Sequence, residues 1–150
     1  MIRDDINAAK IAAMKAGEKD TVGTLRLVQA AILNRDIEAR TGGAPKDDDT
    51  LVTEVLQKMI KQRRESAEVY RKGGREDRAA AEEGEIAVIE RFLPQQLSDA
   101  EADARIREII AETGASSMKD MGRVMALVKE RLGTSIEPAR ASGLVKAALS

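Results

Sequence analysis

Residues 50–72 read TLVTEVLQKMIKQRRESAEVYRK, and this stretch decides the fold class. Its apolar residues recur every three or four positions, a spacing that places them on one face of a helix. The pair Gly73-Gly74 then ends the pattern. We therefore expect one long helix over 50–72, with a buried face made of Val52, Val55, Leu56, Met59, Ile60, Ala67 and Tyr70.

The rest of the chain has the same helical character. Good helix formers (Ala, Leu, Glu, Lys, Arg and Met) dominate, whereas the 150 residues include three Pro, one Phe, one Tyr and no Trp. No segment alternates apolar and polar positions with β-branched residues, as a half-buried strand would. The composition predicts an all-α protein.

Three further helices are expected around the long one, over 4–16, 21–40 and 76–92. The second carries a wide apolar stripe, which predicts that two neighbouring helices cover it. The stripe consists of Leu25, Leu27, Val28, Ala31 and Ile32. An N-terminal domain of about four helices over 1–94 follows from this pattern.

A boundary is expected at Leu93-Pro94, because proline disfavours helix in the residue before it. Ser98-x-x-Glu101 then matches a capping box at the start of a new helix. Three shorter helices should follow, over 99–113, 118–132 and 138–149. We expect them to form a C-terminal three-helix bundle over 95–150.

The inventory of reactive side chains is small. The chain has no Cys and no His, which excludes thiolate nucleophiles, Ser-His-Asp arrangements and imidazole metal ligands. Asp47-Asp48-Asp49 could bind a divalent cation weakly, but acids are also favoured where a helix begins. We predict no catalytic residue, no metal site and no cofactor.

Cellular context is predicted from the same features. No apolar stretch approaches the roughly 20 residues that a membrane-spanning helix needs. The start, MIRDDINAAK, lacks the basic and apolar regions of a signal peptide. We expect a soluble, cytoplasmic monomer without a membrane partner.

Positive charge gathers in the long helix and just beyond it. Residues 58–78 hold eight Lys or Arg against four Asp or Glu, while the whole chain has a net charge of −1. Within the helix, Lys61 and Arg64 each have an acid four residues later, a spacing that allows ion pairs. Arg63, Arg71 and Arg75 have no acid as well placed, and neither does Lys58.

Two interpretations of this charge remain open: a solvated ladder of ion pairs, or a surface for a polyanion. Residues from 115 onward also hold six basic groups against three acidic ones. With almost no aromatic residues, contact with RNA would rely on phosphates and shape rather than on base stacking. The candidate RNA contacts are Lys58, Lys61, Arg63, Arg64, Lys119, Arg123, Lys129 and Lys146.

Several motifs resemble the GatB/YqeY family of small stand-alone helical proteins. They cover nearly the whole chain, in order: Leu25-Arg26-Leu27, Lys58-x-x-Lys61-Gln62-Arg63-Arg64-Glu65-Ser66, Leu93-Pro94-Gln95-Gln96-Leu97 and Gly114-Ala115-Ser116-Ser117-Met118-Lys119-Asp120-Met121-Gly122. The resemblance implies a C-terminal unit similar to the tail domain of the B subunit of glutamyl/aspartyl-tRNA amidotransferase, which helps to hold tRNA. Glu130 and Glu137 reduce the positive charge of one turn in that unit.

The resemblance also implies an association with carbon–nitrogen ligase activity with glutamine as amido-N-donor. The chain lacks the nucleophile, phosphate-binding loop and metal site that such chemistry needs, so we do not expect it to be an enzyme on its own. The expected function is a non-catalytic, tRNA-associated binding module. The alternative is a protein–protein adaptor for a tRNA synthetase or amidotransferase, which would use the wide apolar stripe of the second helix.

Overall fold

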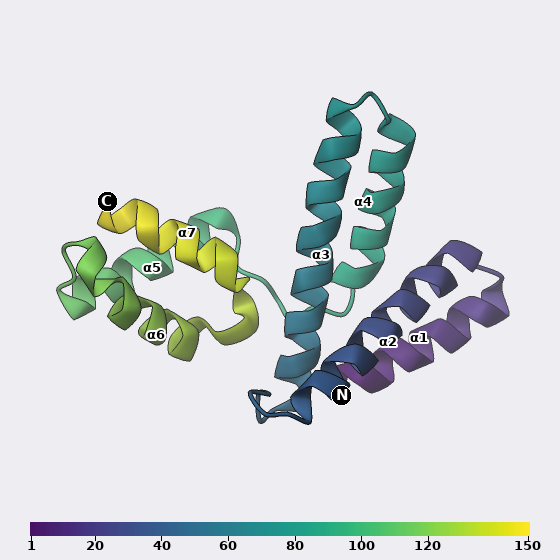
Figure 1. Cartoon of the computed structure of the whole chain (residues 1–150), viewed down its shortest axis with the longest axis horizontal. Helices are drawn as coiled ribbons and strands as arrows, with labels where there is room; N and C mark the ends of the chain where they lie inside the picture. The colour runs from purple at the N-terminus through teal and green to yellow at the C-terminus, as the bar shows by residue number, and fades with distance from the viewer. The chain divides into compact units, whose positions relative to one another are not determined.

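The computed structural model describes every residue from 1 to 150 and contains helices but no strand, which confirms the all-α prediction (Figure 1). Contacts group the chain into two compact units, Met1–Leu93 and Pro94–Ser150, called here the N-terminal and C-terminal units. None of the helices combines the length and the hydrophobicity needed to cross a lipid bilayer. The helices are α1 (Ile2–Ala16), α2 (Lys19–Ala39), α3 (Asp48–Lys72), α4 (Glu76–Glu90), α5 (Asp99–Thr113), α6 (Met121–Leu132) and α7 (Pro138–Leu149), with short 3-10 helices η1 (Met118–Asp120) and η2 (Gly133–Ser135).

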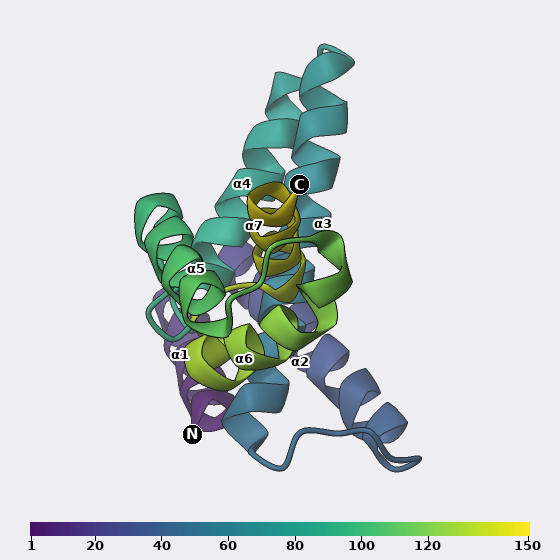
Figure 2. The same cartoon turned by 90° about the vertical axis from the view of Figure 1, so that its left-hand side faces the viewer.

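The N-terminal unit consists of two helical hairpins, α1/α2 and α3/α4. Helices α3 and α4 lie side by side in both views of the molecule (Figures 1 and 2). Helix α2 contacts α1, α3 and α4, so three helices cover it rather than the two that we expected. The core is made of Ile6, Leu25, Val28, Ile32, Leu51, Val52, Val55, Leu56, Met59, Ile60, Ile86 and Ile89.

Local capping explains where several of these helices begin and end. Gly17 ends α1 in the left-handed conformation at φ 75°, which costs glycine little because it has no Cβ. The Asp47 carboxylate accepts a hydrogen bond from the Thr50 amide at 2.9 Å and caps α3. Ser98 and Glu101 form the predicted capping box at the start of α5.

The C-terminal unit packs α5, α6 and α7 around a core of its own. This core comprises Ala102, Ile106, Ile109, Val124, Val128, Leu132, Ile136, Ala141, Val145 and Leu149. The helix expected over 118–132 is divided, because η1 forms first and α6 begins only at Met121. Ser117 and Asp120 exchange hydrogen bonds as a tight capping box, which favours this short turn before the helix.

Candidate functional site

Arg63, one of the predicted RNA contacts, lies against α4 rather than in solvent. Its Nε donates to Glu85 Oε2 at 2.7 Å, and its Nη1 donates to the carbonyl oxygen of Met59 at 3.3 Å. The Arg63 side chain is only 14% exposed. This guanidinium group therefore joins α3 to α4.

The other arginines of the basic run are also paired with acids. Arg64 Nη2 lies 3.3 Å from Glu90 Oε1. Arg71 donates to both carboxylate oxygens of Glu76, at 2.8 and 2.9 Å, and its Nη2 lies 2.7 Å from Glu83. The hydrogen bonds from Arg71 lower the pKa of the Glu76 carboxyl group.

The expectation that Arg63, Arg71 and Arg75 lack a well-placed acid is therefore wrong. Arg75 pairs with Asp77, two residues later in the chain. The partners of Arg63 and Arg71 come mainly from α4, which runs back along α3 and brings its glutamates beside them. The positive charge of the run is thus largely balanced within the α3/α4 hairpin.

The lysines of α3 differ from its arginines. Lys58 and Lys61 are exposed and form no ion pair. Arg64 bonds to Glu90 of α4 instead of Glu68, the acid four residues later, and Glu68 pairs with Lys72 at 3.1 Å. Two cations are therefore available to a partner on the outer side of α3.

Arg123 and Lys129, two of the predicted contacts in the C-terminal unit, lie on different sides of α6. Arg123 pairs with Asp120 at 3.1 Å, whereas Lys119 is exposed without an ion pair. Lys129 follows Arg123 by six residues in α6, about 240° around the helix axis, so the two point in different directions. Lys146 is exposed on α7.

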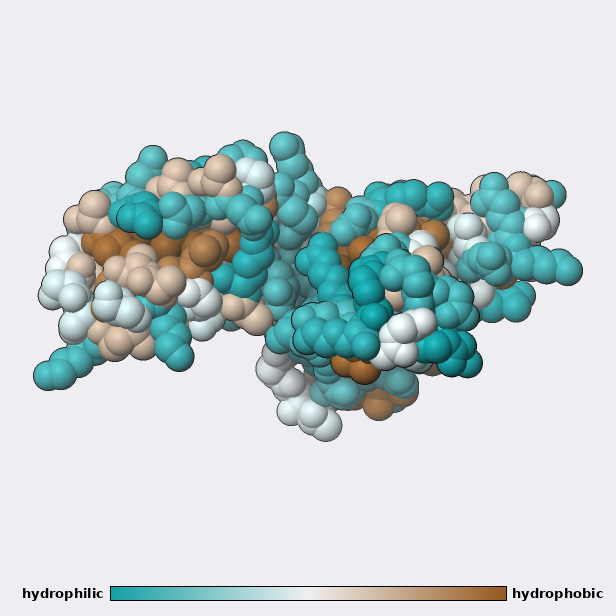
Figure 3. All heavy atoms as spheres, turned by 90° about the horizontal axis from the view of Figure 1, so that it is seen from above, coloured by the Kyte–Doolittle hydropathy of each residue, from teal (hydrophilic) through white to brown (hydrophobic).

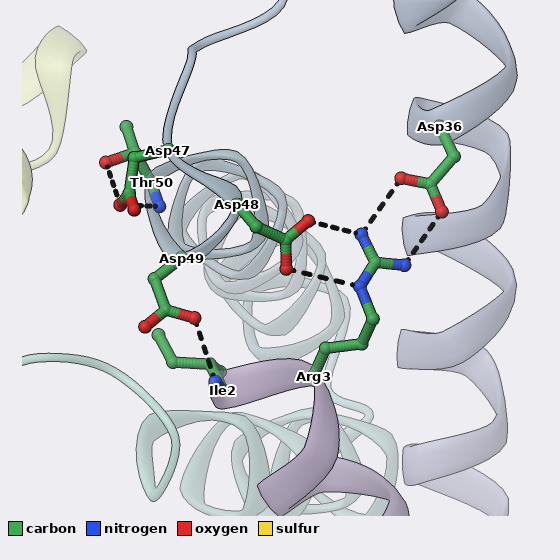
Figure 4. Close-up of polar contacts among 7 residues, drawn as sticks. All are labelled: Ile2, Arg3, Asp36, Asp47, Asp48, Asp49 and Thr50. Carbon is green, nitrogen blue, oxygen red and sulfur yellow. Dashed lines mark hydrogen bonds and ion pairs between the residues drawn. The ribbon is translucent and has the colours of Figure 1, made fainter.

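A polar cluster not predicted from the sequence joins the starts of α1 and α3 to the end of α2 (Figure 4). Arg3 bridges two carboxylates, with Nη1 2.8 Å from Asp36 and Nη2 2.8 Å from Asp48. The amide of Ile2 donates to Asp49 at 2.9 Å. Asp47, Asp48 and Asp49 are thus all engaged at helix starts.

The ion pairs of this cluster shift the pKa of one of its carboxyl groups, and its carboxylates are all held by other groups of the protein. The hydrogen bonds from Arg3 lower the pKa of Asp36, since they favour its charged form. A shallow cavity of about 180 Å³ lies beside it, lined by Arg3, Ile6, Gln29, Ile32, Leu33 and Asp36. With its carboxylates held by a cation and by helix amides, the cluster is suited to fixing the α1/α2 hairpin on α3.

The α1/α2 hairpin exposes large apolar side chains. On α2, Leu27, Leu33 and Ile37 are 50%, 57% and 49% exposed, and Ile11 and Met14 of α1 are exposed as well. Helical spacing places Leu27, Leu33 and Ile37 on the outward side of α2, away from the buried Leu25, Val28 and Ile32. We call these five residues the apolar hairpin surface. Leu27 was expected in the buried stripe and instead belongs to this surface.

Apolar residues also reach the surface of the C-terminal unit, where Figure 3 shows them among hydrophilic neighbours. Half-buried Leu, Ile and Met side chains pack against the outside of the core of that unit. Met118 is its most exposed large apolar residue. The N-terminal unit nevertheless exposes the larger set.

Comparison with known proteins places the chain in a family. The family described as Yqey-like protein matches residues 3–149. The chain is 29% identical over 124 residues to Altered inheritance of mitochondria protein 41, mitochondrial, of Pyrenophora tritici-repentis, covering 79% of the chain and 66% of the relative. It is 34% identical over 133 residues to the protein of that name in Meyerozyma guilliermondii, covering 84% and 66%. An uncharacterized protein of Schizosaccharomyces pombe is 35% identical over 86 residues, covering 57% and 67%.

The lengths and the names of these relatives bear on two expectations about the chain. The chain spans about half to two thirds of the length of the curated relatives that it matches. Four of them carry names that describe mitochondrial proteins. The prediction of a cytoplasmic location is contradicted by these names and is wrong.

Proposed function

The chain belongs to the YqeY-like protein family, and on this premise we propose that it is a non-catalytic binding module whose α1/α2 hairpin docks on a partner protein. The match over residues 3–149 confirms the family resemblance seen in the motifs. The partner class implied by that resemblance is a tRNA synthetase or an amidotransferase. The apolar hairpin surface carries the proposal.

Exposed apolar side chains of this size favour a protein partner. Single apolar residues on a surface are ordinary, but contiguous patches tend to mark interaction sites. Leu33 and Ile37 are four residues apart on one side of α2, so they can meet the apolar face of a second helix. A partner helix lying along this side of α2 would bury both, whereas Leu27, six residues before Leu33, lies about 120° away around the helix axis.

The balance of charge supports a protein partner over a nucleic acid. Affinity for RNA depends strongly on cations that neutralise phosphates. Arg63, Arg64 and Arg71 are already held by the acids of α4. The run that first suggested a polyanion surface therefore contributes fewer free cations than its composition implied.

Affinity capture from cell extract tests the proposal. Leu33→Ser combined with Ile37→Ser should abolish capture of the partner in ribonuclease-treated extract, while circular dichroism stays unchanged. Val69→Ser is a matched control, because Val69 is a β-branched apolar residue 69% exposed on α3. Equal capture by the double variant and the control would exclude the apolar hairpin surface as the docking site.

A second candidate function, binding of tRNA, is supported by five exposed lysines without ion pairs. They are Lys58, Lys61, Lys119, Lys129 and Lys146. If all five contact phosphates, the logarithm of the binding constant should fall with the logarithm of salt concentration with a slope of about −4. Lys58→Ala combined with Lys61→Ala should reduce that slope by about 2.

Exposed Lys15 and Lys19 at the α1/α2 turn provide the matched control for this titration. Their replacement by Ala removes the same charge from a different surface, and it should leave the slope unchanged. No detectable binding of folded tRNA at about 50 mM salt would reject this second function.

A further inference from the structure

The α3/α4 hairpin has two halves that are stabilised differently. Near the core, α3 buries its side chains from Leu51 to Ile60, except for Glu54 and Lys58, and α4 buries Ile86 and Ile89. The far half, residues 64–84, runs from Arg64 through the Gly73-Gly74 turn and back to Gly84. Its only buried side chains are Ala67 and Ala79. Because alanine removes little apolar surface from water, the far half gains little from the hydrophobic effect.

A groove lies between α3 and α4 in the far half of the hairpin. It has a volume of about 420 Å³ and is lined by Arg64, Ala67, Glu68, Arg71, Lys72, Glu83 and Ile86. Ala67 is buried beside it, while the charged side chains are exposed. The two helices are therefore not joined by interlocking apolar side chains over this length.

Polar contacts between exposed groups hold the far half instead. Arg71 binds both Glu76 and Glu83, and Arg64 reaches back to Glu90. The guanidinium carbon of Arg78 lies 5.8 Å from the centre of the Tyr70 ring, within the range of a cation–π contact. Exposed ion pairs weaken as salt screens them, so this half of the hairpin should respond to ionic strength.

We propose that residues 64–84 form an electrostatic latch. The far half opens as a local unit when its ion pairs are screened, while the near half of the hairpin stays folded. Opening separates Arg64 and Arg71 from the α4 carboxylates and leaves the positive charge of these two residues unneutralised on α3. The glutamates of α4 thus act as internal counter-anions that neutralise Arg64 and Arg71 while the hairpin is closed.

Hydrogen exchange of the full chain, read by mass spectrometry, tests the latch because local opening sets the exchange rate of each segment. Raising salt from about 20 mM to about 500 mM should speed exchange of amides in 64–84 by roughly tenfold, since the Debye length falls from about 20 Å to about 4 Å and screens these exposed charges much more strongly. Amides of 51–60 should keep the same rate. Because they lie in the same molecule, they serve as the internal reference.

Substitutions distinguish opening that depends on the Arg71 ion pairs from a nonspecific loss of stability in residues 64–84. Glu76→Gln combined with Glu83→Gln keeps side-chain size but removes the charges held by Arg71. We expect this variant to exchange rapidly in 64–84 at low salt and to lose most of the salt response. Glu65→Gln is the matched control, because Glu65 is exposed in the same hairpin and forms no ion pair.

Two results would overturn the proposal. If 64–84 and 51–60 exchange at the same rate at both salt concentrations, the far half does not open separately. If 64–84 exchanges rapidly but the double variant behaves like Glu65→Gln, the ion pairs do not hold it closed. Neither variant threatens folding, since substitutions at exposed positions rarely unfold a protein.

Discussion

Replacing Arg63 with Ala should destabilise the N-terminal unit, because this side chain joins α3 to α4. Breaking a fully buried ion pair costs about 3–5 kcal/mol, whereas an exposed pair contributes about 0.2–1 kcal/mol. Arg63 is 14% exposed and Glu85 is 34% exposed, so their pair falls between these limits. The variant also loses the hydrogen bond to Met59 and the packing of the arginine stem. We expect the free energy of unfolding to fall by about 2 kcal/mol.

Urea unfolding followed by hydrogen exchange at 51–60 measures this quantity for the N-terminal unit alone. With an m-value of about 1.3 kcal/mol per molar urea, the midpoint should fall by about 1.5 M. Lys61→Ala, two residues earlier and exposed, is the matched control and should change stability by less than about 0.5 kcal/mol. Equal midpoints for the two variants would show that Arg63 has no structural role.

A double-mutant cycle with Glu85→Gln isolates the pair itself. The two substitutions should couple by about 1–1.5 kcal/mol, as expected for charged groups in direct contact. Coupling below about 0.3 kcal/mol would mean that the contact at 2.7 Å contributes nothing to stability, and that Arg63 is free to serve a partner.

Four further outcomes are expected from the structure. Leu56→Ala, at a fully buried position, should cost about 2–5 kcal/mol in urea unfolding. Arg3 lowers the pKa of Asp36, so the stability from this pair is present at neutral pH and is lost as pH falls through the folded-state pKa; Asp36→Asn should flatten that acid dependence. Ser98→Ala should cost the C-terminal unit about 0.5–2 kcal/mol, seen as faster exchange in α5. Gly114→Ala, at φ 68°, should lower the thermal stability of the same unit by about 1–2 kcal/mol.

The helices could be predicted from the sequence because their signals are local. Apolar spacing marked the buried face of α3, and Gly17 and Gly114 marked helix ends where the chain turns left-handed. The division of the helix expected over 118–132 into η1 and α6 was not predicted. Ser117 and Asp120 bond to each other across one turn, and this local competition outweighed the helical pattern that continues through Met118.

Partners across helices could not be predicted from spacing. Counting acids four residues away finds neighbours on one helix, but Glu85 lies 22 positions from Arg63 and meets it only because α4 folds back. The same limit applies to Arg3, whose carboxylate partners are 33 and 45 positions away. Leu27 was assigned to the core because its helical stripe is wide, and only the positions of α1, α3 and α4 show which edge of that stripe remains uncovered.

No residue is shared between the two apolar cores, since one is built from residues 6–89 and the other from residues 102–149. A cavity made in one core therefore removes no buried residue from the other core. The two cores can accordingly be perturbed one at a time, and a substitution inside a core reports on the unit that contains it.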